Sequence, residues 1–366
     1  MPKQTQTISA KKTAPRANSS ELDELFKIAV NNKASDLHLV VGQPPLIRID
    51  GRLNMVKNQD IMTNEKLEEL LFSITSEQQK NNLVKKRDLD MSYEITDVAR
   101  FRINMHYEKG NLGLVARVVT HHIPDMKEIV MPEASYNLAR LRDGLILVTG
   151  PTGSGKSTTL AAMINMINTE RNAHIVTLED PIEFIFDPTD SIIKQRELGS
   201  DVLSFASGLK HTLRQDPDVI MVGEMRDLET IAATMTLAET GHLVLATLHT
   251  INAAQTIDRI IDVFPPYQQD QIRVQLSMSL RGVVSQRLLV KQNGGRIASR
   301  EILINNSAIA NLIRENKIAQ IKTVIQTSAE MGMVTMDQDI KRLFKEGVIT
   351  KETAVSNMID PRTLNT

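Results

Sequence analysis

A glycine-rich run in the middle of the chain has residue types and spacing suited to binding phosphate. Its glycines permit backbone angles that turn successive N–H groups inward, where they can hold phosphate oxygens at a helix N-terminus. In loops of the form G-x-x-x-x-G-K-[ST], the lysine reaches the β- and γ-phosphates of a nucleotide and the hydroxyl ligates Mg²⁺. This sequence matches that form in full, which predicts ATP as the ligand and magnesium as its metal. The run and the residue after it are Gly150, Pro151, Thr152, Gly153, Ser154, Gly155, Lys156, Ser157 and Thr158.

The residues on either side supply the elements that such a loop needs. The apolar run Leu145–Thr149 is typical of a buried strand, and a helical pattern begins near Lys156. Because a chance glycine turn would seldom lie between a strand and a helix in this register, we assign phosphate contact to Lys156 and magnesium ligation to Ser157. The segment therefore predicts an ATPase.

An acidic residue follows another short apolar run, Val219–Val222. Glu224 lies just past the C-terminal end of this predicted strand, which is the end where α/β sheets bind ligands. It is expected to hold magnesium directly or through water, although a surface glutamate would give the same sequence. Asp218 lies at the other end of the strand, so we expect it to serve a turn or a cap.

Three carboxylates, Glu179, Asp180 and Glu183, follow the predicted strand His174–Leu178. One of them could orient the attacking water and accept its proton. Their spacing does not decide which one, and an acidic surface loop is the alternative.

Two histidines flank the predicted strand Leu243–Thr247. His249 follows the strand, where it could sense the γ-phosphate, whereas His242 precedes it. A lone histidine is more often structural, and for His242 the structural and the functional role are equally expected. Both are candidate catalytic residues.

Short apolar runs separated by helical stretches dominate the chain from Leu145 onward. Such runs are typical of buried parallel strands that crossover helices cover on both faces. Residues 21–120 instead show the alternation of antiparallel strands, mixed with helices, and residues 121–139 are expected to include a linker. Residues 140–366 would then form the ATPase domain, with helices from about Asn305 on, and residues 1–20 a disordered tail.

Composition excludes several kinds of protein. The chain has no cysteine, which excludes disulfides and cysteine-ligated zinc and fits a reducing, cytoplasmic compartment. Its net charge of −1 provides no basic field, so we expect no nucleic-acid partner. An apolar run of about eighteen residues, the length that spans a bilayer, is absent, so we expect no direct membrane insertion.

Four segments, in order, resemble the motifs of the secretion ATPase superfamily, the hexameric motors of type IV pili and type II secretion. They look like its Walker A loop, aspartate box, atypical Walker B motif and histidine box. The resemblance extends from about Glu21 to the end of the chain, and it implies an N-terminal PAS-like α/β domain and a C-terminal RecA-like P-loop NTPase domain with a helical end. The segments are Gly150–Ser157, Leu178–Phe184, Val222–Asp227 and Thr240–Thr250.

Within this superfamily the chain most resembles the type IV pilus retraction ATPases of twitching motility. Ala308–Glu315 is similar to the retraction-specific motif A-I-R-N-L-I-R-E, except that Ala310 replaces the first arginine. The chain also lacks the cysteines of the zinc insertion, and the extra N-terminal domain, that assembly and secretion motors carry. The alternatives are an accessory retraction paralogue, which the change at Ala310 leaves open, and a pilus assembly or type II secretion ATPase.

The resemblance also implies roles and partners. It makes Glu183 the catalytic base and Glu224 the acid of the magnesium site, and it places Arg102 and Arg117 of the N-terminal domain against ATP at a subunit boundary. It further implies a homohexamer at the inner face of the cytoplasmic membrane, with an inner-membrane pilus platform protein and a paralogous motor as partners. Hydrolysis would then change the angle between the two domains.

Two other classes of protein share the phosphate loop. A regulatory protein that switches partners on ATP binding would hydrolyse little ATP, and the presence of both Glu183 and Glu224 argues against it. A helicase-like nucleic-acid motor needs a cationic surface, which a near-neutral chain without a basic stripe does not provide.

Overall fold

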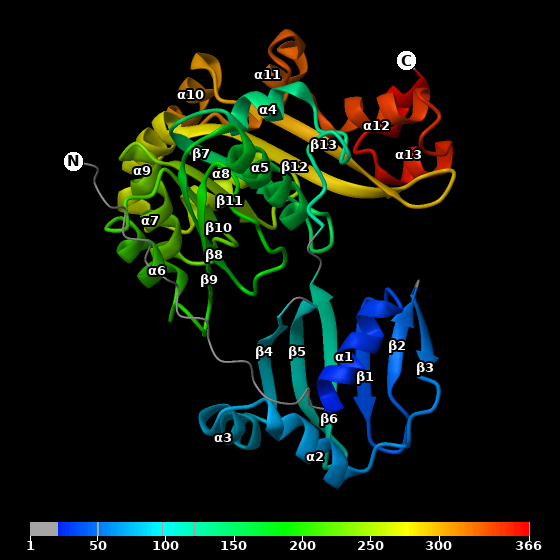
Figure 1. Cartoon of the computed structure of the whole chain (residues 1–366). Helices are drawn as coiled ribbons and strands as arrows, with labels where there is room; N and C mark the ends of the chain where they lie inside the picture. The colour runs from blue at the N-terminus through cyan, green and yellow to red at the C-terminus, as the bar shows by residue number, and fades with distance from the viewer. Residues whose placement is uncertain (1–20, 50, 97, 120–121, 366) are drawn as a thin grey trace, which may run out of the picture. The chain divides into compact units, whose positions relative to one another are not determined.

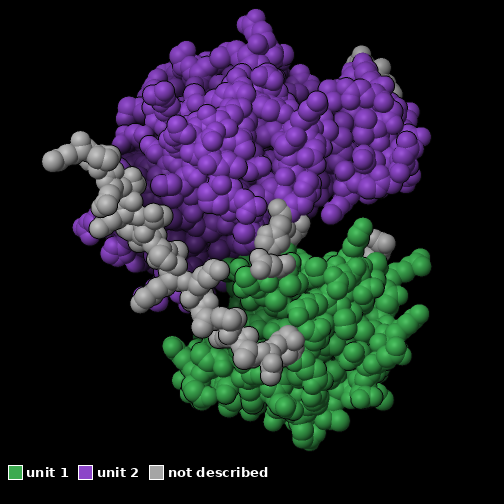
Figure 2. Space-filling view, in the orientation of Figure 1, with its two compact units in different colours: residues 1–120 green, residues 121–366 purple. Residues whose placement is uncertain are grey.

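The computed structural model describes residues 21–49, 51–96, 98–119 and 122–365. The chain divides into two compact units, residues 1–120 and residues 121–366 (Figure 2). The predicted tail, residues 1–20, lies outside the described residues. Each unit has its own sheet and its own hydrophobic core.

The first unit is an antiparallel six-stranded sheet with the strand order β3-β2-β1-β6-β5-β4, packed against three helices. Alternation along β5 directs Phe101, Ile103 and Met105 into the core, while Arg102 is exposed on the other face. The elements of this unit are α1 (Glu21–Asn31), β1 (Asp36–Val40), β2 (Leu46–Ile49), β3 (Arg52–Met55), α2 (Asn64–Ser73), α3 (Glu77–Lys86), β4 (Asp88–Ile95), β5 (Ala99–Glu108) and β6 (Asn111–Val119).

Helix α1 closes this core with one apolar face. Its buried residues Leu22, Leu25 and Phe26 recur at helical spacing, which explains why this segment forms an amphipathic helix. The ring of Phe26 stacks on that of Phe101, with 4.4 Å between the ring centroids. Because the core occupies this side of β5, the arginine between its core residues faces away from it.

The second unit contains a seven-stranded sheet with the strand order β13-β12-β7-β11-β10-β8-β9 (Figure 1). All neighbouring strands are parallel except β12 and β13. This confirms the predicted parallel sheet and, with the first unit, the predicted α/β fold class. The strands are β7 (Gly144–Thr149), β8 (His174–Glu179), β9 (Ile192–Glu197), β10 (Val219–Val222), β11 (Leu243–Leu248), β12 (Leu280–Val290) and β13 (Arg296–Ile304).

Helices cover both faces of this sheet. In β7, Leu145 and Leu147 belong to the core shared with α6 to α9, whereas Ile146 and Val148 belong to the core shared with α4 and α5. Strands buried on both faces read as continuous apolar runs, which is why the sequence shows them so clearly. These helices are α4 (Glu133–Ala139), α5 (Lys156–Glu170), α6 (Phe205–Thr212), α7 (Leu228–Glu239), α8 (Ala253–Asp262) and α9 (Pro266–Ser279).

Short helices follow the sheet, as expected from about Asn305 on. The long β12–β13 hairpin reaches toward two of them, and α12 packs on β13 (Figure 1). A small separate core joins Leu289 of the hairpin to Ile340 and Leu343 of α12. No helix among the described residues is both long enough and apolar enough to cross a lipid bilayer. The helices are α10 (Ser307–Arg314), α11 (Ile321–Thr327), α12 (Met336–Lys345) and α13 (Lys351–Asn357).

Residues 122–139 form part of the second unit, although the sequence predicted that this region includes the linker. Met126, Met131 and Leu138 are buried in the core beside α5. The expectation rested on two prolines, which mark bends here, while the apolar side chains near them pack onto the sheet. The body of the second unit thus begins earlier than residue 140.

Candidate active site

The predicted phosphate-binding residues gather where the central parallel strands end. The loop after β7 begins at Gly150, and its N–H donates to the carbonyl of Leu248 at the end of β11 (3.3 Å). The main chain of Gly223, after β10, donates to Leu178 of β8 (2.8 Å), and Met225 donates to Thr247 of β11 (3.1 Å). Since the four strands are neighbours in the order β7-β11-β10-β8, their loops form one edge, as ligand sites in α/β sheets require.

The phosphate loop depends on glycine at two positions in particular. Gly150 has φ of 146°, and a Cβ atom there would lie 2.3 Å from the carbonyl oxygen of Gln286. Gly155 precedes α5 with φ of 88° and no side chain caps that helix, so its first N–H groups are left for another acceptor. An uncapped helix N-terminus within a glycine loop is an anion site.

Lys156 is folded into its own loop. Its Nζ donates to the carbonyls of Gly150 (2.8 Å) and Pro151 (3.1 Å). Burial lowers the pKa of this ammonium, while the carboxylates of Glu224 and Glu183 oppose the shift. The lysine therefore interacts with both predicted acids, and phosphate oxygens are the stronger acceptors that would replace the two carbonyls.

Glu224 is held by two side chains, those of Arg226 and His249. Its Oε1 lies 2.7 Å from Nε of Arg226 and 2.8 Å from Nε2 of His249. Partial burial would raise the pKa of this carboxyl, but the contacts with Arg226 and His249 outweigh burial and lower it. The structure thus brings Glu224 and His249 together, and it adds Arg226, for which the sequence predicted no role.

The structure separates the three carboxylates after β8. Glu179 is buried and accepts from Thr177 Oγ1 (2.6 Å) and Gln195 Nε2 (3.1 Å), and its burial raises its pKa. Asp180 is exposed and acts electrostatically on Arg226. Glu183 is exposed and acts on Lys156. Glu183 thus acts on the lysine from the surface, whereas the hydrogen bonds of Glu179 hold it against β8 and β9.

His242 is not part of this cluster. It precedes β11, at the end of the strand opposite to His249, and its Nδ1 lies 3.0 Å from the carbonyl of Leu237 and 3.1 Å from Thr240 Oγ1. Both partners belong to the end of α7 and the turn that leads from it into β11. The contacts of His242 therefore hold this turn. Asp218 has the turn role that we expected, since its carboxylate accepts the main-chain N–H of His174 (2.8 Å).

Arg102 and Arg117 lie on adjacent strands of the first unit. They are directly opposite each other across β5 and β6, and both are exposed. The Nε of Arg117 donates to the buried carboxylate of Asp36 (2.9 Å). Like charges that face each other across strands are destabilising, and the carboxylate of Asp36 offsets this repulsion on the Arg117 side.

A pocket of about 220 Å³ adjoins the phosphate loop, and neither Lys156 nor Glu183 nor Glu224 is among its lining residues. Ser154, Gly155 and Thr158 line it from the loop and helix α5, and β12 contributes Gln286 and Leu288. This wall was not predicted from the sequence. A polar pair, Ser285-Gln286, interrupting an apolar strand was the available signal.

Gln286 ties the phosphate loop to β12. Its Nε2 donates to the carbonyl of Ser154 (2.8 Å), and its Oε1 accepts from Thr159 Oγ1 (2.9 Å), with the glutamine itself buried. One side chain thus satisfies two buried groups at the start of α5.

We expect Gln286→Met to lower the free energy of unfolding by about 1–3 kcal/mol, because two buried polar groups lose their partner. The loosened loop should also raise the KM for ATP. Chemical denaturation and steady-state kinetics measure the two effects, with Gln292→Met, at an exposed position of the same hairpin, as control. An unchanged KM in the Gln286 variant would contradict the positioning role.

Hard oxygen donors for magnesium are present in the site. The Ser157 hydroxyl and the Glu224 carboxylate suit Mg²⁺, which is usually held by one or two protein oxygens together with substrate phosphates and water. The described residues contain no cluster of three His, Cys, Asp or Glu side chains that would hold a metal by protein alone. This donor set fits a metal that arrives with a nucleotide.

The sequence is similar to proteins of pili and secretion. The profile of a family described as "Type II/IV secretion system protein" matches residues 11–348. The "Type IV pilus retractation ATPase PilT" of Pseudomonas aeruginosa is 45% identical over 334 residues, which cover 91% of this chain and 97% of that protein. A "Twitching motility protein" of Neisseria gonorrhoeae is 48% identical over 311 residues, covering 85% of this chain and 83% of the relative.

The fold is also similar to a solved structure, "Crystal Structure of the Pilus Retraction Motor PilT and Bound ADP". The TM-score is 0.88 at 45% sequence identity, and the match covers 95% of this chain and 99% of the other. The similarity therefore spans both units, and the related protein binds a nucleotide.

Proposed function

This chain belongs to the type II/IV secretion system protein family, and on that premise we propose that it is an ATPase motor that drives retraction of a type IV pilus. The observation that carries the proposal is the cluster of Lys156, Glu183, Glu224 and His249 around one phosphate loop. Such a cluster fits hydrolysis of a nucleoside triphosphate. Similarity to a retraction ATPase along nearly its whole length supplies the biological direction.

The triphosphate of ATP would lie in the loop with its γ-phosphate beside Lys156. Glu183 and Glu224, the two acids that act on Lys156, would mark the γ-phosphate end of the loop. Ser154 and Thr158 would lie toward the other end, where they line the pocket. The nucleoside would therefore enter that pocket, which is bordered by the apolar side chains of Leu288 and Ile297. Pockets for nucleosides combine apolar walls with few polar groups in this way.

Ser157 and Glu224 would hold magnesium against the phosphates. The metal supplies neutralisation of the charge on the phosphate oxygens. His249 and Arg226 both contact Oε1 of Glu224, so the metal would take the other oxygen of this carboxylate. Glu183, free of such a clamp in the contacts that the structure shows, would position water and accept its proton.

The arginines of the first unit would complete the site in a ring. Arg102 and Arg117 would stabilise the charge that develops on the γ-phosphate, a recurring role of guanidinium groups in phosphoryl transfer. We propose that six copies form the ring, with ATP at subunit boundaries. Hydrolysis would alter the angle between the units and pass motion around the ring.

The motor would work from the cytoplasmic face of the inner membrane. Its partners would be an inner-membrane pilus platform protein and a paralogous motor, and its contact with the membrane would be indirect. The four-motif order and the similarity to a pilus ATPase support this placement.

The shared site can be tested by mixing two inactive variants. Arg102→Ala and Lys156→Ala each disable one side of a boundary, so a mixed ring should regain part of the ATPase activity that neither variant has alone. Steady-state phosphate release measures the recovery, and Arg52→Ala, at another exposed position of the same sheet, should retain activity unmixed. Failure of every mixing ratio to restore activity would argue against a site shared between subunits.

Direction of work is tested in the host. We expect deletion of the gene to increase the number of surface pili seen by electron microscopy and to abolish surface motility, and the wild-type gene, but not Lys156→Ala, to restore both. Cells without pili would instead identify an assembly motor, and an unchanged number would identify an accessory paralogue.

A further inference from the structure

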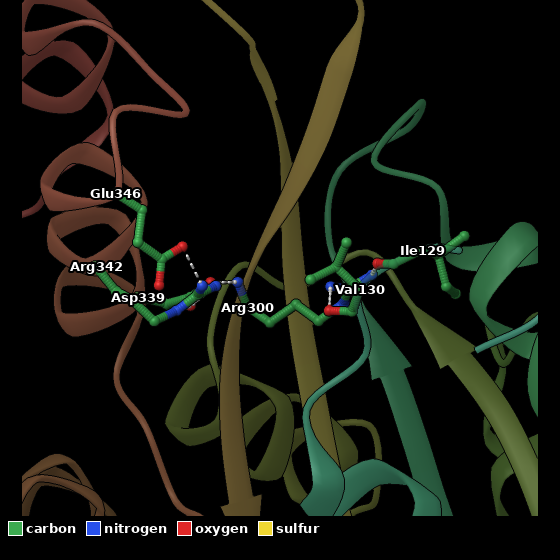
Figure 3. A network of polar contacts seen from close by, with 6 residues as sticks. All are labelled: Ile129, Val130, Arg300, Asp339, Arg342 and Glu346. Carbon is green, nitrogen blue, oxygen red and sulfur yellow. Dashed lines mark hydrogen bonds and ion pairs between the residues drawn. The ribbon is translucent and has the colours of Figure 1, made fainter. Parts of the chain in front are cut away.

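A buried arginine holds the turn that borders the nucleotide pocket. Arg300 of β13 is 3% exposed, and its Nη1 and Nη2 donate to the carbonyls of Val130 (3.0 Å) and Ile129 (2.9 Å) (Figure 3). Val130 has φ of 52°, a conformation that is uncommon for a β-branched residue. Two charge-assisted hydrogen bonds thus add to the main-chain hydrogen bonds that hold this segment.

Arg300 also contacts the C-terminal helix α12. Figure 3 shows Arg300 between the turn and helix α12, whose Asp339 accepts the main-chain N–H of Arg300 (2.8 Å). Asp339 also accepts from Arg342 (2.7 Å), and Arg342 contacts Glu346 (2.8 Å). The carboxylate is therefore shared with a second arginine, and the guanidinium tip of Arg300 is left facing carbonyl oxygens.

Burying the guanidinium of Arg300 lowers the stability of the folded state, because the charge loses its contact with water. Burial lowers the pKa of Arg300 to about 10, although Asp339 works against the shift, and the guanidinium stays charged at neutral pH. Its Nε has no hydrogen-bond partner among the described residues. An apolar side chain in the place of a buried charge is often neutral or stabilising, so packing alone does not explain an arginine here.

The turn and the arginine meet at the same pocket. Glu128, Ile129, Val130 and Arg300 line it together with residues of the phosphate loop. Arg300 is also the direct cross-strand partner of Gln286, the residue that holds the loop from the other strand of the hairpin. The β12–β13 hairpin therefore fixes two walls of one pocket, the loop through Gln286 and the turn through Arg300.

We propose that Arg300 is a positioning residue that holds the 128–130 turn as a wall of the nucleoside end of the ATP site. The inference rests on the proposed function, because it takes the ligand to be a nucleotide whose phosphates occupy the adjacent loop. Arg300 governs how tightly the nucleoside is held, and it leaves binding of the phosphates to the loop.

Comparing the affinities for ADP and for inorganic tripolyphosphate distinguishes an effect on nucleoside binding from an effect on phosphate binding. ADP occupies both the loop and the pocket, whereas inorganic tripolyphosphate occupies the loop alone. We expect Arg300→Met to weaken ADP about tenfold, the effect of losing charge-assisted hydrogen bonds that shape one wall, and to change tripolyphosphate affinity less than about twofold. In steady state the KM for ATP should rise while kcat is retained.

Arg300→Lys should give an intermediate ADP affinity, because an ammonium can reach one carbonyl without the guanidinium fork. Arg342→Met is the matched control, since it removes an arginine from the same network without touching the turn, and it should bind both ligands as wild type does. Calorimetric titration of the full chain measures the affinities, and thermal melting checks folding.

ADP affinity within about twofold of wild type in folded Arg300→Met would overturn the proposal. Equal weakening of ADP and tripolyphosphate would also overturn it, because the residue would then act on the whole site. If the methionine variant does not fold, the same comparison on Arg300→Lys decides. A wild-type protein that binds neither ligand would instead refute the ATP site itself.

Discussion

Lys156→Ala is expected to reduce ATP hydrolysis by at least about 10²–10³-fold, the cost of removing one preorganised charge from a transition state. The ammonium has a second task here, because the carboxylates of Glu224 and Glu183 both act on it. Without it those acids would repel the triphosphate. Affinity for ATP should therefore fall together with kcat.

The melting temperature of Lys156→Ala shows whether lost activity comes from the missing ammonium or from unfolding of the protein. Burial lowers the pKa of Lys156, which means that the fold disfavours its charged form. Truncation to alanine should then leave the melting temperature unchanged or slightly raised. Lys210→Ala, at an exposed position on α6, is the control for general effects of lysine removal. Phosphate release above a tenth of the wild-type rate would contradict the assignment of the loop.

The strand-end residues could be predicted because parallel strands impose a common edge. A motif after β7, β8, β10 or β11 has only one end of the sheet to occupy, so their convergence follows from chain order and apolar runs. The same logic places His242 at the opposite edge, since it comes before its strand. Its pairing with His249 in one motif reflected sequence proximity rather than position in the sheet.

Burial and long-range pairing could not be read from spacing. Glu179 and Glu183 are both glutamates at the end of one strand, yet Glu179 is enclosed by hydrogen bonds and Glu183 is exposed. Arg300 looks like an ordinary strand residue until the fold brings it to a turn 170 residues earlier in the chain. Neither the residue type nor the adjacent sequence of Glu179, Glu183 and Arg300 indicates whether these side chains are buried or what they contact.

The extent of the linker is hard to predict from the sequence for a related reason. Prolines near residues 121–139 indicated a break in regular structure, but a break does not reveal whether the segment packs. Met126 and Met131 pack against the sheet because the methionine side chain is flexible and fills irregular gaps. One wall of the pocket beside the phosphate loop is thus built from a stretch that the sequence pattern describes as a connection.

Glu183→Gln is expected to lower kcat by about 10²–10⁴-fold while ADP affinity is retained. Glutamine keeps the size and the hydrogen-bonding capacity of the side chain, so water can still be oriented, but the amide does not accept its proton. Removing a negative charge near Lys156 also favours the bound triphosphate, which makes tighter ATP binding the expected companion of slow hydrolysis. Single-turnover phosphate release and ATP titration measure the two quantities.

Asp180→Asn is the matched control, because Asp180 is an exposed acid of the same loop that acts on Arg226 rather than on Lys156. It should retain hydrolysis within about tenfold of wild type, the factor that corresponds to a small change in transition-state energy. If Asp180→Asn were the slow variant and Glu183→Gln the active one, the base would be Asp180. If both variants were active, proton transfer would have to be assigned to Glu224. The carboxylate of Glu224 is already engaged by His249 and Arg226. Our assignment of the metal to Glu224 and of the base to Glu183 would then be wrong.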